Sequence, residues 1–300
     1  MTDIVPVRRE LALAEGAVSY LEWKGEGAQP ALHFAHANGF NGMTYRHLLA
    51  PLASRFRIRA WDARGHGMTA LPADPANHAN WYVYRDDLIR FVENFAAEAG
   101  GPVLLGGHSM GGTTSLMVAA ERPDLVRGLI LVDPVMVPRA ARLMMSLYNL
   151  TGRKGGPNSL ADGAERRRNA FTDKAAMAAA YKGRGAFRTW PQEMVVDYVE
   201  GGTKPRPEGG IELACAPAWE AANFRAHGHD TWDALARLKV PLTLIYAGDG
   251  STCRAPAPQL LGESDPKATL LRLGQATHFL PMEFPDIVRR ETLALDARLS

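Results

Sequence analysis

PVLLGGHSMGGTTSLMVAAE, residues 102–121, begins as a short apolar run of the kind that forms a buried strand. It ends with the apolar spacing of a helix, and GHSMG (107–111) lies between the two, followed by Gly112. A serine on such a sharp strand-to-helix turn must adopt strained backbone angles, and flanking glycines let neighbouring chain come close. The context therefore predicts that Ser109 is a nucleophile raised above the edge of a sheet.

Short apolar runs alternate with segments of helical period on both sides of this stretch. Such alternation is typical of the α/β class, in which a mainly parallel central sheet is flanked by helices. Residues 11–23 alternate around a Glu-Gly turn, which predicts an antiparallel hairpin at the sheet edge. Buried strands are predicted at 31–37, 56–63, 102–109, 128–135, 241–248 and 268–274.

A long segment separates two of these predicted strands. The run that ends at Val135 and the run that starts at Pro241 lie about a hundred residues apart, whereas a simple crossover takes about a dozen. The segment contains helix formers such as FTDKAAMAAAYKG (171–183) between stretches rich in glycine and proline. We therefore predict a helical cap at 135–235, inserted into an α/β core formed by 1–134 and 236–300.

Composition and charge limit the class of partner. The chain has 300 residues, of which 46% are hydrophobic and 22% charged, and its formal net charge is only +2. Such a balance gives no strong field for gathering nucleic acid or anionic lipid, so a small-molecule substrate is expected, without nucleic acid or membrane insertion.

No signal-peptide core or bilayer-spanning run is visible, which predicts a cytoplasmic enzyme. The sequence leaves a monomer and a homodimer both open.

A serine hydroxyl needs a base, and histidine suits that work because its pKa lies near neutrality. His278 follows the last predicted strand, in a loop that leaves the carboxyl end of the sheet. His108 and His66 are instead expected to make local hydrogen bonds. The two cysteines, Cys215 and Cys253, lack the spacing of a zinc or thiol-exchange site, and no cofactor or metal is expected.

Four pieces of the chain together resemble the α/β-hydrolase superfamily. They are HANGF (36–40) after a strand, DARGHG (62–67) after the next, the turn around Ser109, and the loop at His278. The order serine, acid, histidine also matches, and the resemblance extends over nearly the whole predicted core. It implies an oxyanion hole made of backbone amides. By this resemblance, the loop after the first parallel strand supplies Asn38 or Phe40, and the residue after the nucleophile supplies Met110.

The acid behind the histidine is left open between two aspartates. A carboxylate there fixes the imidazole tautomer and stabilises its positive charge during proton transfer. Asp249 follows the strand where most of the superfamily carries its acid, but it falls about one residue early. Asp133 ends the preceding strand, where a minority of members, including some haloalkane dehalogenases, carry theirs. We slightly favour Asp133, with a turn or helix-capping role as the alternative for it.

A serine nucleophile implies acyl transfer, because the epoxide hydrolases and haloalkane dehalogenases of this superfamily carry an aspartate at that position. The leading hypothesis is a serine esterase that cleaves carboxylic esters of a small, fairly apolar substrate through an acyl-enzyme on Ser109. A carbon–carbon bond hydrolase or a lactonase with the same triad is the enzymatic alternative. A small-molecule receptor with little turnover is the alternative from another class.

Substrate contacts are predicted on both sides of the catalytic groups. The cap segment around Arg184 places cations beside aromatic side chains, so that arginine is a candidate partner for a substrate carboxylate. A solvated cation, or one packed on Trp190, is the alternative. The predicted substrate-binding residues are His36, Phe40, Arg184, Phe187, Trp190 and Phe279.

Overall fold

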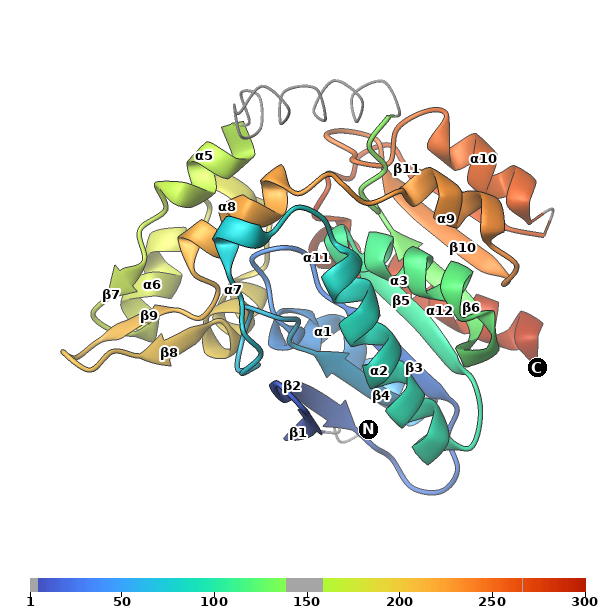
Figure 1. Ribbon diagram of the computed structural model, residues 1–300, viewed down its shortest axis with the longest axis horizontal. Coiled ribbons are helices and arrows are strands. Elements are labelled where there is room, and N and C mark those ends of the chain that lie inside the picture. The colour runs from blue at the N-terminus through green and yellow to red at the C-terminus, as the bar shows by residue number, and fades with distance from the viewer. Residues whose placement is uncertain (1–4, 139–158, 266) are drawn as a thin grey trace.

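The computed structural model describes residues 5–138, 159–265 and 267–300. Within these ranges, eight strands form one twisted sheet that runs through the middle of the molecule (Figure 1). In spatial order, its strands are β1 (Val7–Leu13), β2 (Gly16–Trp23), β4 (Arg57–Trp61), β3 (Ala31–Ala35), β5 (Val103–His108), β6 (Val126–Val132), β10 (Leu242–Ala247) and β11 (Thr269–Leu273).

The pairing confirms a mainly parallel sheet. All pairs from β4 to β11 are parallel, whereas β1 and β2 pair antiparallel with each other and β2 does so with β4. The predicted hairpin is present, with Leu13 opposite Gly16 at its turn. Each predicted buried strand is also present, although its ends move by up to three residues. Their apolar runs are continuous because helices cover both faces of a parallel sheet.

Helices form a layer on each face of the sheet. Buried side chains of α2, α3, α9 and α10 belong to the hydrophobic cluster on one face, and those of α1 and α12 belong to the cluster on the other. The helices of these layers and of the loop after β11 are α1 (Arg46–Leu49), α2 (Tyr82–Ala99), α3 (Met110–Glu121), α9 (Thr231–Arg237), α10 (Ala257–Ser264), α11 (Leu280–Glu283) and α12 (Pro285–Leu299). Short 3₁₀ turns are η1 (Gly42–Tyr45), η2 (Ala50–Ser54), η3 (Pro75–Asn77) and η4 (Pro123–Leu125).

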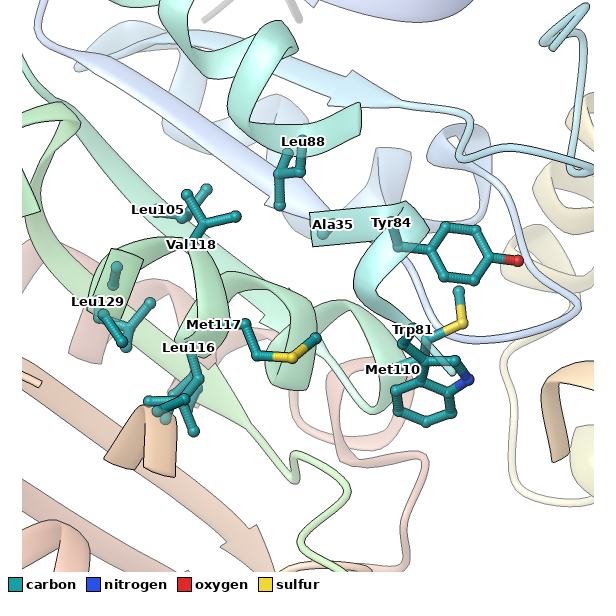
Figure 2. Close-up of a cluster of buried hydrophobic side chains, with 14 of the residues drawn as sticks. Ala35, Trp81, Tyr84, Leu88, Leu105, Met110, Leu116, Met117, Val118 and Leu129 are labelled. Carbon is teal, nitrogen blue, oxygen red and sulfur yellow. The ribbon is translucent and has the colours of Figure 1, made fainter. Parts of the chain in front are cut away.

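The helix that follows Ser109 is buried along almost its whole length. Every residue of α3 from Met110 to Ala120 is buried, which is expected of a helix that is apolar all round. Figure 2 shows Val118 of this helix and Leu105 of β5 in the same cluster, together with side chains of α2. Ser109 is therefore carried by two closely packed elements.

Between β6 and β10, the described elements from α5 to α8 form a body at one end of the sheet (Figure 1). Its described part contains a three-stranded sheet as well as helices, which the sequence analysis did not predict. The last residues of the predicted cap, 231–235, belong to α9, which packs on α3 of the core. The other elements are α5 (Ser159–Glu165), β7 (Ala170–Phe171), α6 (Lys174–Tyr181), η5 (Gly185–Phe187), α7 (Gln192–Gly201), β8 (Thr203–Pro205), β9 (Ile211–Leu213) and α8 (Pro217–Arg225).

Neither a membrane-spanning helix nor a metal centre occurs among the described residues. No described helix combines the length and apolar character needed to cross a bilayer. In the same ranges, no three or more histidine, cysteine, aspartate or glutamate side chains gather in a way that would hold a metal ion. Both cysteines are buried as free thiols.

Candidate active site

Ser109 stands on the turn between β5 and α3. Its φ of 55° and ψ of −119° lie in a region that residues with a Cβ rarely adopt, so the serine is held under strain. The surrounding glycines allow a close approach of chain. A Cβ on Gly111 would lie 2.2 Å from the carbonyl oxygen of Ala35, and one on Gly107 would lie 2.4 Å from the Gly111 carbonyl carbon. The turn therefore requires glycine at both positions.

Three side chains from separate loops meet at this turn. The Oγ of Ser109 lies 3.0 Å from Nε2 of His278. On the other side of the imidazole, Nδ1 of His278 lies 2.6 Å from Oδ2 of Asp133. Because Nδ1 faces a carboxylate and donates to it, Nε2 is left to accept the serine proton. Ser109 and His278 were paired in the sequence analysis, and the structure brings them together with one of the two candidate acids.

The carboxylate of Asp133 is fully buried and heavily bonded. Its two oxygens accept hydrogen bonds from the amide of Ala247 at 2.9 Å, the hydroxyl of Ser251 at 2.6 Å and the amide of Thr252 at 3.0 Å. Burial opposes ionisation of Asp133, but the hydrogen bonds from His278 and Ser251 outweigh it and lower the pKa of the carboxyl group. Asp133 is therefore ionised at neutral pH.

Asp249, the other candidate acid, lies away from the imidazole. The residue is exposed in the loop after β10, and its backbone amide donates to the carbonyl of Ala276 at 3.2 Å. The loop after β10 reaches the site through Ser251 and Thr252, which donate to Asp133. The loop after β10 therefore contributes hydrogen-bond donors to the site, and the carboxylate itself comes from Asp133 at the end of β6.

Two backbone amides beside the serine are free to donate. Neither Asn38 nor Met110 has an acceptor for its N–H among the described residues. Met110 begins α3, where the N–H groups have no partner within the helix and carry the positive end of its dipole. The amide of Phe40, the alternative to Asn38, already donates to the carbonyl of Ala37 at 3.1 Å.

His108 connects the loops on either side of the serine. Its Nε2 donates to the carbonyl oxygen of His278 at 2.8 Å, so its Nδ1 must accept the hydrogen bond of 2.7 Å from the hydroxyl of Tyr45. That hydroxyl in turn accepts from the amide of Ala37 at 3.1 Å. Burial lowers the pKa of His108 to about 3, which keeps it neutral. His108 therefore makes the hydrogen bonds that were expected of it, but with residues far along the chain, Tyr45 and His278.

An aromatic cluster covers the site next to the base. Phe40 stacks on Phe279 with ring centroids 6.3 Å apart, and its edge meets Trp190 at 5.2 Å. Phe187 meets Trp190 at 4.8 Å. Tyr198, which the sequence analysis did not single out, lies 5.7 Å from Phe40. Four of the predicted substrate-binding residues thus come together from the core and from the inserted segment.

The other two predicted substrate-binding residues do not belong to this cluster. The imidazole of His36 accepts from the amide of Ala63 at 2.9 Å and donates to the carbonyl of Ala37 at 2.7 Å, so both nitrogens are used within the fold. Arg184 is exposed at the start of η5. An exposed guanidinium is in contact with water, so the contact with a substrate carboxylate stays a prediction.

Among the described residues of the inserted segment, Arg167 is a largely buried cation that contacts Glu220 and Tyr198. Its Nη1 lies 2.9 Å from Oε2 of Glu220, and its Nε lies 3.2 Å from the hydroxyl of Tyr181. Its Nη2 donates to the hydroxyl of Tyr198 at 2.5 Å. Sequence reasoning passed over Arg167 because it stands in a run of three arginines, which normally indicates a solvated face.

Four buried histidines predict a stability loss in acid. Burial lowers the pKa of His36 to about 4 and the pKa values of His33, His66 and His108 to about 3. An unfolded histidine titrates near pH 6.5, so below that pH the unfolded chain binds protons that the folded chain refuses. The contribution is fully present above 6.5 and falls away toward 3, by about 2 kcal/mol per histidine at pH 5.

Urea denaturation between pH 8 and 4.5 measures this effect. We expect the midpoint to stay level from pH 8 to 7 and to drop steeply between 6.5 and 5. A Tyr45→Phe variant is a matched control, since it removes a neighbour of His108 but no titrating group in this range. A midpoint that is unchanged at pH 5 would show that these imidazoles are protonated in the folded protein.

Comparisons with known proteins identify the family of the chain. A family model described as "Alpha/beta hydrolase family" matches residues 34–291. Over 269 residues, the chain is 26% identical to 2-(acetamidomethylene)succinate hydrolase of Mesorhizobium japonicum, an alignment that covers 89% of this chain and 88% of the relative. A segment of 118 residues is 31% identical to human monoglyceride lipase and covers 38% of each chain.

Solved structures with the same fold cover nearly the whole chain. The crystal structure of E-2-(acetamidomethylene)succinate hydrolase superposes with a TM-score of 0.79, over 97% of this chain and 99% of that one. The two sequences are 22% identical in this superposition. At that level the likeness concerns the fold, and the chemistry has to be argued from the side chains.

Proposed function

Because the chain belongs to the alpha/beta hydrolase family, we propose that it is a serine hydrolase that cleaves carboxylic esters or related amides through an acyl-enzyme on Ser109. The observation that supports this most is the unbroken hydrogen-bonded array from Ser109 through His278 to Asp133, with contacts of 3.0 and 2.6 Å. A nucleophile, a base and an ionised acid at hydrogen-bond distance are what acyl transfer requires.

The steps follow from the positions of these groups. His278 takes the proton of Ser109 as the hydroxyl attacks the acyl carbon, and the ionised Asp133 stabilises the imidazolium that forms. The free amides of Asn38 and Met110 donate to the oxygen on which negative charge develops. His278 then gives its proton to the leaving group, and a water molecule, activated by the same base, releases the acid and frees the serine.

The inserted segment is expected to determine which acyl groups and leaving groups fit the site. The cluster around Phe40 and Trp190 favours a small substrate with an apolar or aromatic part. The name of the Mesorhizobium relative specifies an acetamido group, whose carbonyl is an acyl carbon bound to nitrogen, while a lipase acts on esters. The serine hydroxyl can attack the acyl carbon of an ester or of an amide, so the proposal covers both classes of substrate.

A substrate panel with mass detection tests this proposal. We expect the wild type to hydrolyse p-nitrophenyl acetate, and an acetyl adduct on the peptide that carries Ser109 to appear on rapid quenching in acid. Acetanilide tests the amide, and a vinylogous diketone tests the carbon–carbon alternative. Cleavage of the diketone alone would replace the proposal with carbon–carbon hydrolysis, and binding of the esters without turnover would favour a receptor.

Arg167 supports a substrate that carries a carboxylate. Its side chain is mostly buried, with 19% of its surface accessible, and its partner Glu220 lies against the loop of Asn38. The substrate named for the Mesorhizobium relative is a succinate, which is anionic. A charge-assisted hydrogen bond is worth about 1.5–3 kcal/mol, so an anionic ester should be preferred by roughly tenfold or more.

Two esters of similar length measure this preference. We expect p-nitrophenyl hemisuccinate to have a higher kcat/KM than p-nitrophenyl valerate in the wild type, and Arg167→Gln to remove the difference. Arg184→Gln is the matched control, because that arginine is exposed. A preference for hemisuccinate that survives in Arg167→Gln would assign carboxylate recognition to another group.

A further inference from the structure

The loop that carries the free amide of Asn38 is bonded to helix α8 of the inserted segment. The side-chain amide of Asn38 donates to the carbonyl oxygen of Glu220 at 3.0 Å. Its oxygen accepts from Nδ2 of Asn223, also at 3.0 Å. Both asparagines are buried, with exposed fractions of 8% for Asn38 and 0% for Asn223. These contacts join residues that are more than 180 positions apart in the sequence.

The direction of each bond in this network is fixed by its chemistry. The Glu220 carbonyl can only accept, so Asn38 must present its NH₂ group there and its oxygen to Asn223. Asn223 must then donate with its own NH₂ group, which leaves its Oδ1 to accept from the hydroxyl of Tyr84 at 2.9 Å. The indole of Trp81 also donates to the carbonyl of Asn223 at 3.1 Å. Figure 2 shows the Tyr84 hydroxyl pointing out of the core cluster that holds Trp81.

The backbone of the same loop is confined from both sides. Gly39 has a φ of 75°, and a Cβ on it would lie 2.5 Å from Oε1 of Glu220. On the opposite side, the amide of Gly39 donates to Nε2 of His66 at 3.0 Å. Because His66 accepts with that nitrogen, its contact of 3.4 Å with Oδ1 of Asn38 supplies no hydrogen. Asn223 is therefore the donor that holds the Asn38 oxygen.

We infer that Asn223 is a positioning residue of the oxyanion hole, which sets the direction of the Asn38 backbone N–H through the Asn38 side chain. The inference rests on the proposed function, in which that N–H stabilises the developing oxyanion. Its consequence is that α8 completes the catalytic site as well as covering it. A donor that is misdirected by about 1 Å costs on the order of a hundredfold in rate.

Asn223→Leu tests this inference with nearly unchanged shape. Leucine fills the space of asparagine but donates nothing, so the Asn38 side chain loses its anchor while the packing of α8 is kept. We expect kcat for phenyl acetate to fall between about tenfold and a hundredfold, with KM changed less than about twofold.

Asn223→Ala is the second variant, in case the buried leucine destabilises the fold. Arg225→Ala is the matched control, since Arg225 is on the same helix but pairs with Glu165 and Asp162 at the surface.

A thionoester separates the oxyanion hole from general damage to the site. Sulfur is a weak hydrogen-bond acceptor, so hydrolysis of phenyl thionoacetate depends little on the oxyanion donors. We expect the ratio of kcat/KM for phenyl acetate to that for phenyl thionoacetate to fall at least about fivefold in Asn223→Leu and to stay unchanged in Arg225→Ala. A loss that is equal for both substrates would overturn the inference.

Hydrogen exchange gives a readout that needs no turnover. Amide exchange in the peptide that spans residues 34–42 should become faster in both Asn223 variants and remain as in the wild type in Arg225→Ala. Unchanged exchange in this peptide would overturn the inference. If the wild type hydrolysed neither an ester nor an amide, the proposed function would fail, while the exchange experiment would still decide whether Asn223 holds the loop.

Discussion

Ser109→Ala is expected to fold normally and to lose ester hydrolysis by a factor on the order of 10⁴ to 10⁶. The hydroxyl is the atom that forms the acyl bond in the proposed mechanism, so no other group of the array can replace it. The residual rate should come from the free amides of Asn38 and Met110 and from substrate binding. Steady-state hydrolysis of p-nitrophenyl acetate, with intact-mass detection of the acetyl adduct, measures both consequences.

The matched control for this variant is Ser115→Ala, on the same helix. Ser115 is buried and donates to the carbonyl of Gly106 at 3.2 Å, away from the imidazole. Its loss should affect stability and leave turnover within a few-fold. An acetyl adduct on Ser109→Ala, or turnover near the wild-type rate, would move the nucleophile elsewhere.

Asp133→Asn is expected to lower kcat by about 10⁴-fold, and Asp249→Asn to leave it nearly unchanged. An asparagine in place of Asp133 no longer supplies an anion at Nδ1 of His278, so the imidazolium is not stabilised and the wrong tautomer is favoured. Asp249 is exposed and does not contact the imidazole, which makes it the natural control. The comparison is made on purified proteins with equal folded fractions by circular dichroism.

The size of the two losses decides which aspartate is the acid. A large loss of kcat in Asp133→Asn alone would assign that role to Asp133, whose Oδ2 lies 2.6 Å from Nδ1 of His278. Equal, small losses in both variants would show that neither aspartate is the acid.

The sheet and the nucleophile turn could be predicted because their signals are local. The run before Ser109 is apolar, the residues after it have helical spacing, and the glycines between them permit close chain approach. The predicted strands shifted only at their ends, by up to three residues. His278 was found for the same reason, since it follows the last strand directly.

The choice of acid could not be made from the sequence. Asp133 and Asp249 both follow a strand, and what separates them is the set of donors that Ser251 and Thr252 bring from another loop. Those contacts depend on the register between β6 and β10, which no single segment reports. Arg167 was missed and Arg184 chosen for a similar reason. Whether an arginine is buried depends on Tyr181 and Tyr198, which lie elsewhere in the chain.

Ser109 and Asp133 share one structural feature, a positive φ at the end of adjacent strands, of 55° and 42°. Neither is glycine, so each costs about 1–3 kcal/mol of conformational free energy. Glycine at either position should relieve this strain and raise the free energy of unfolding, but it would remove a side chain on which the proposed chemistry depends. Stability and reactivity are therefore opposed at these two residues.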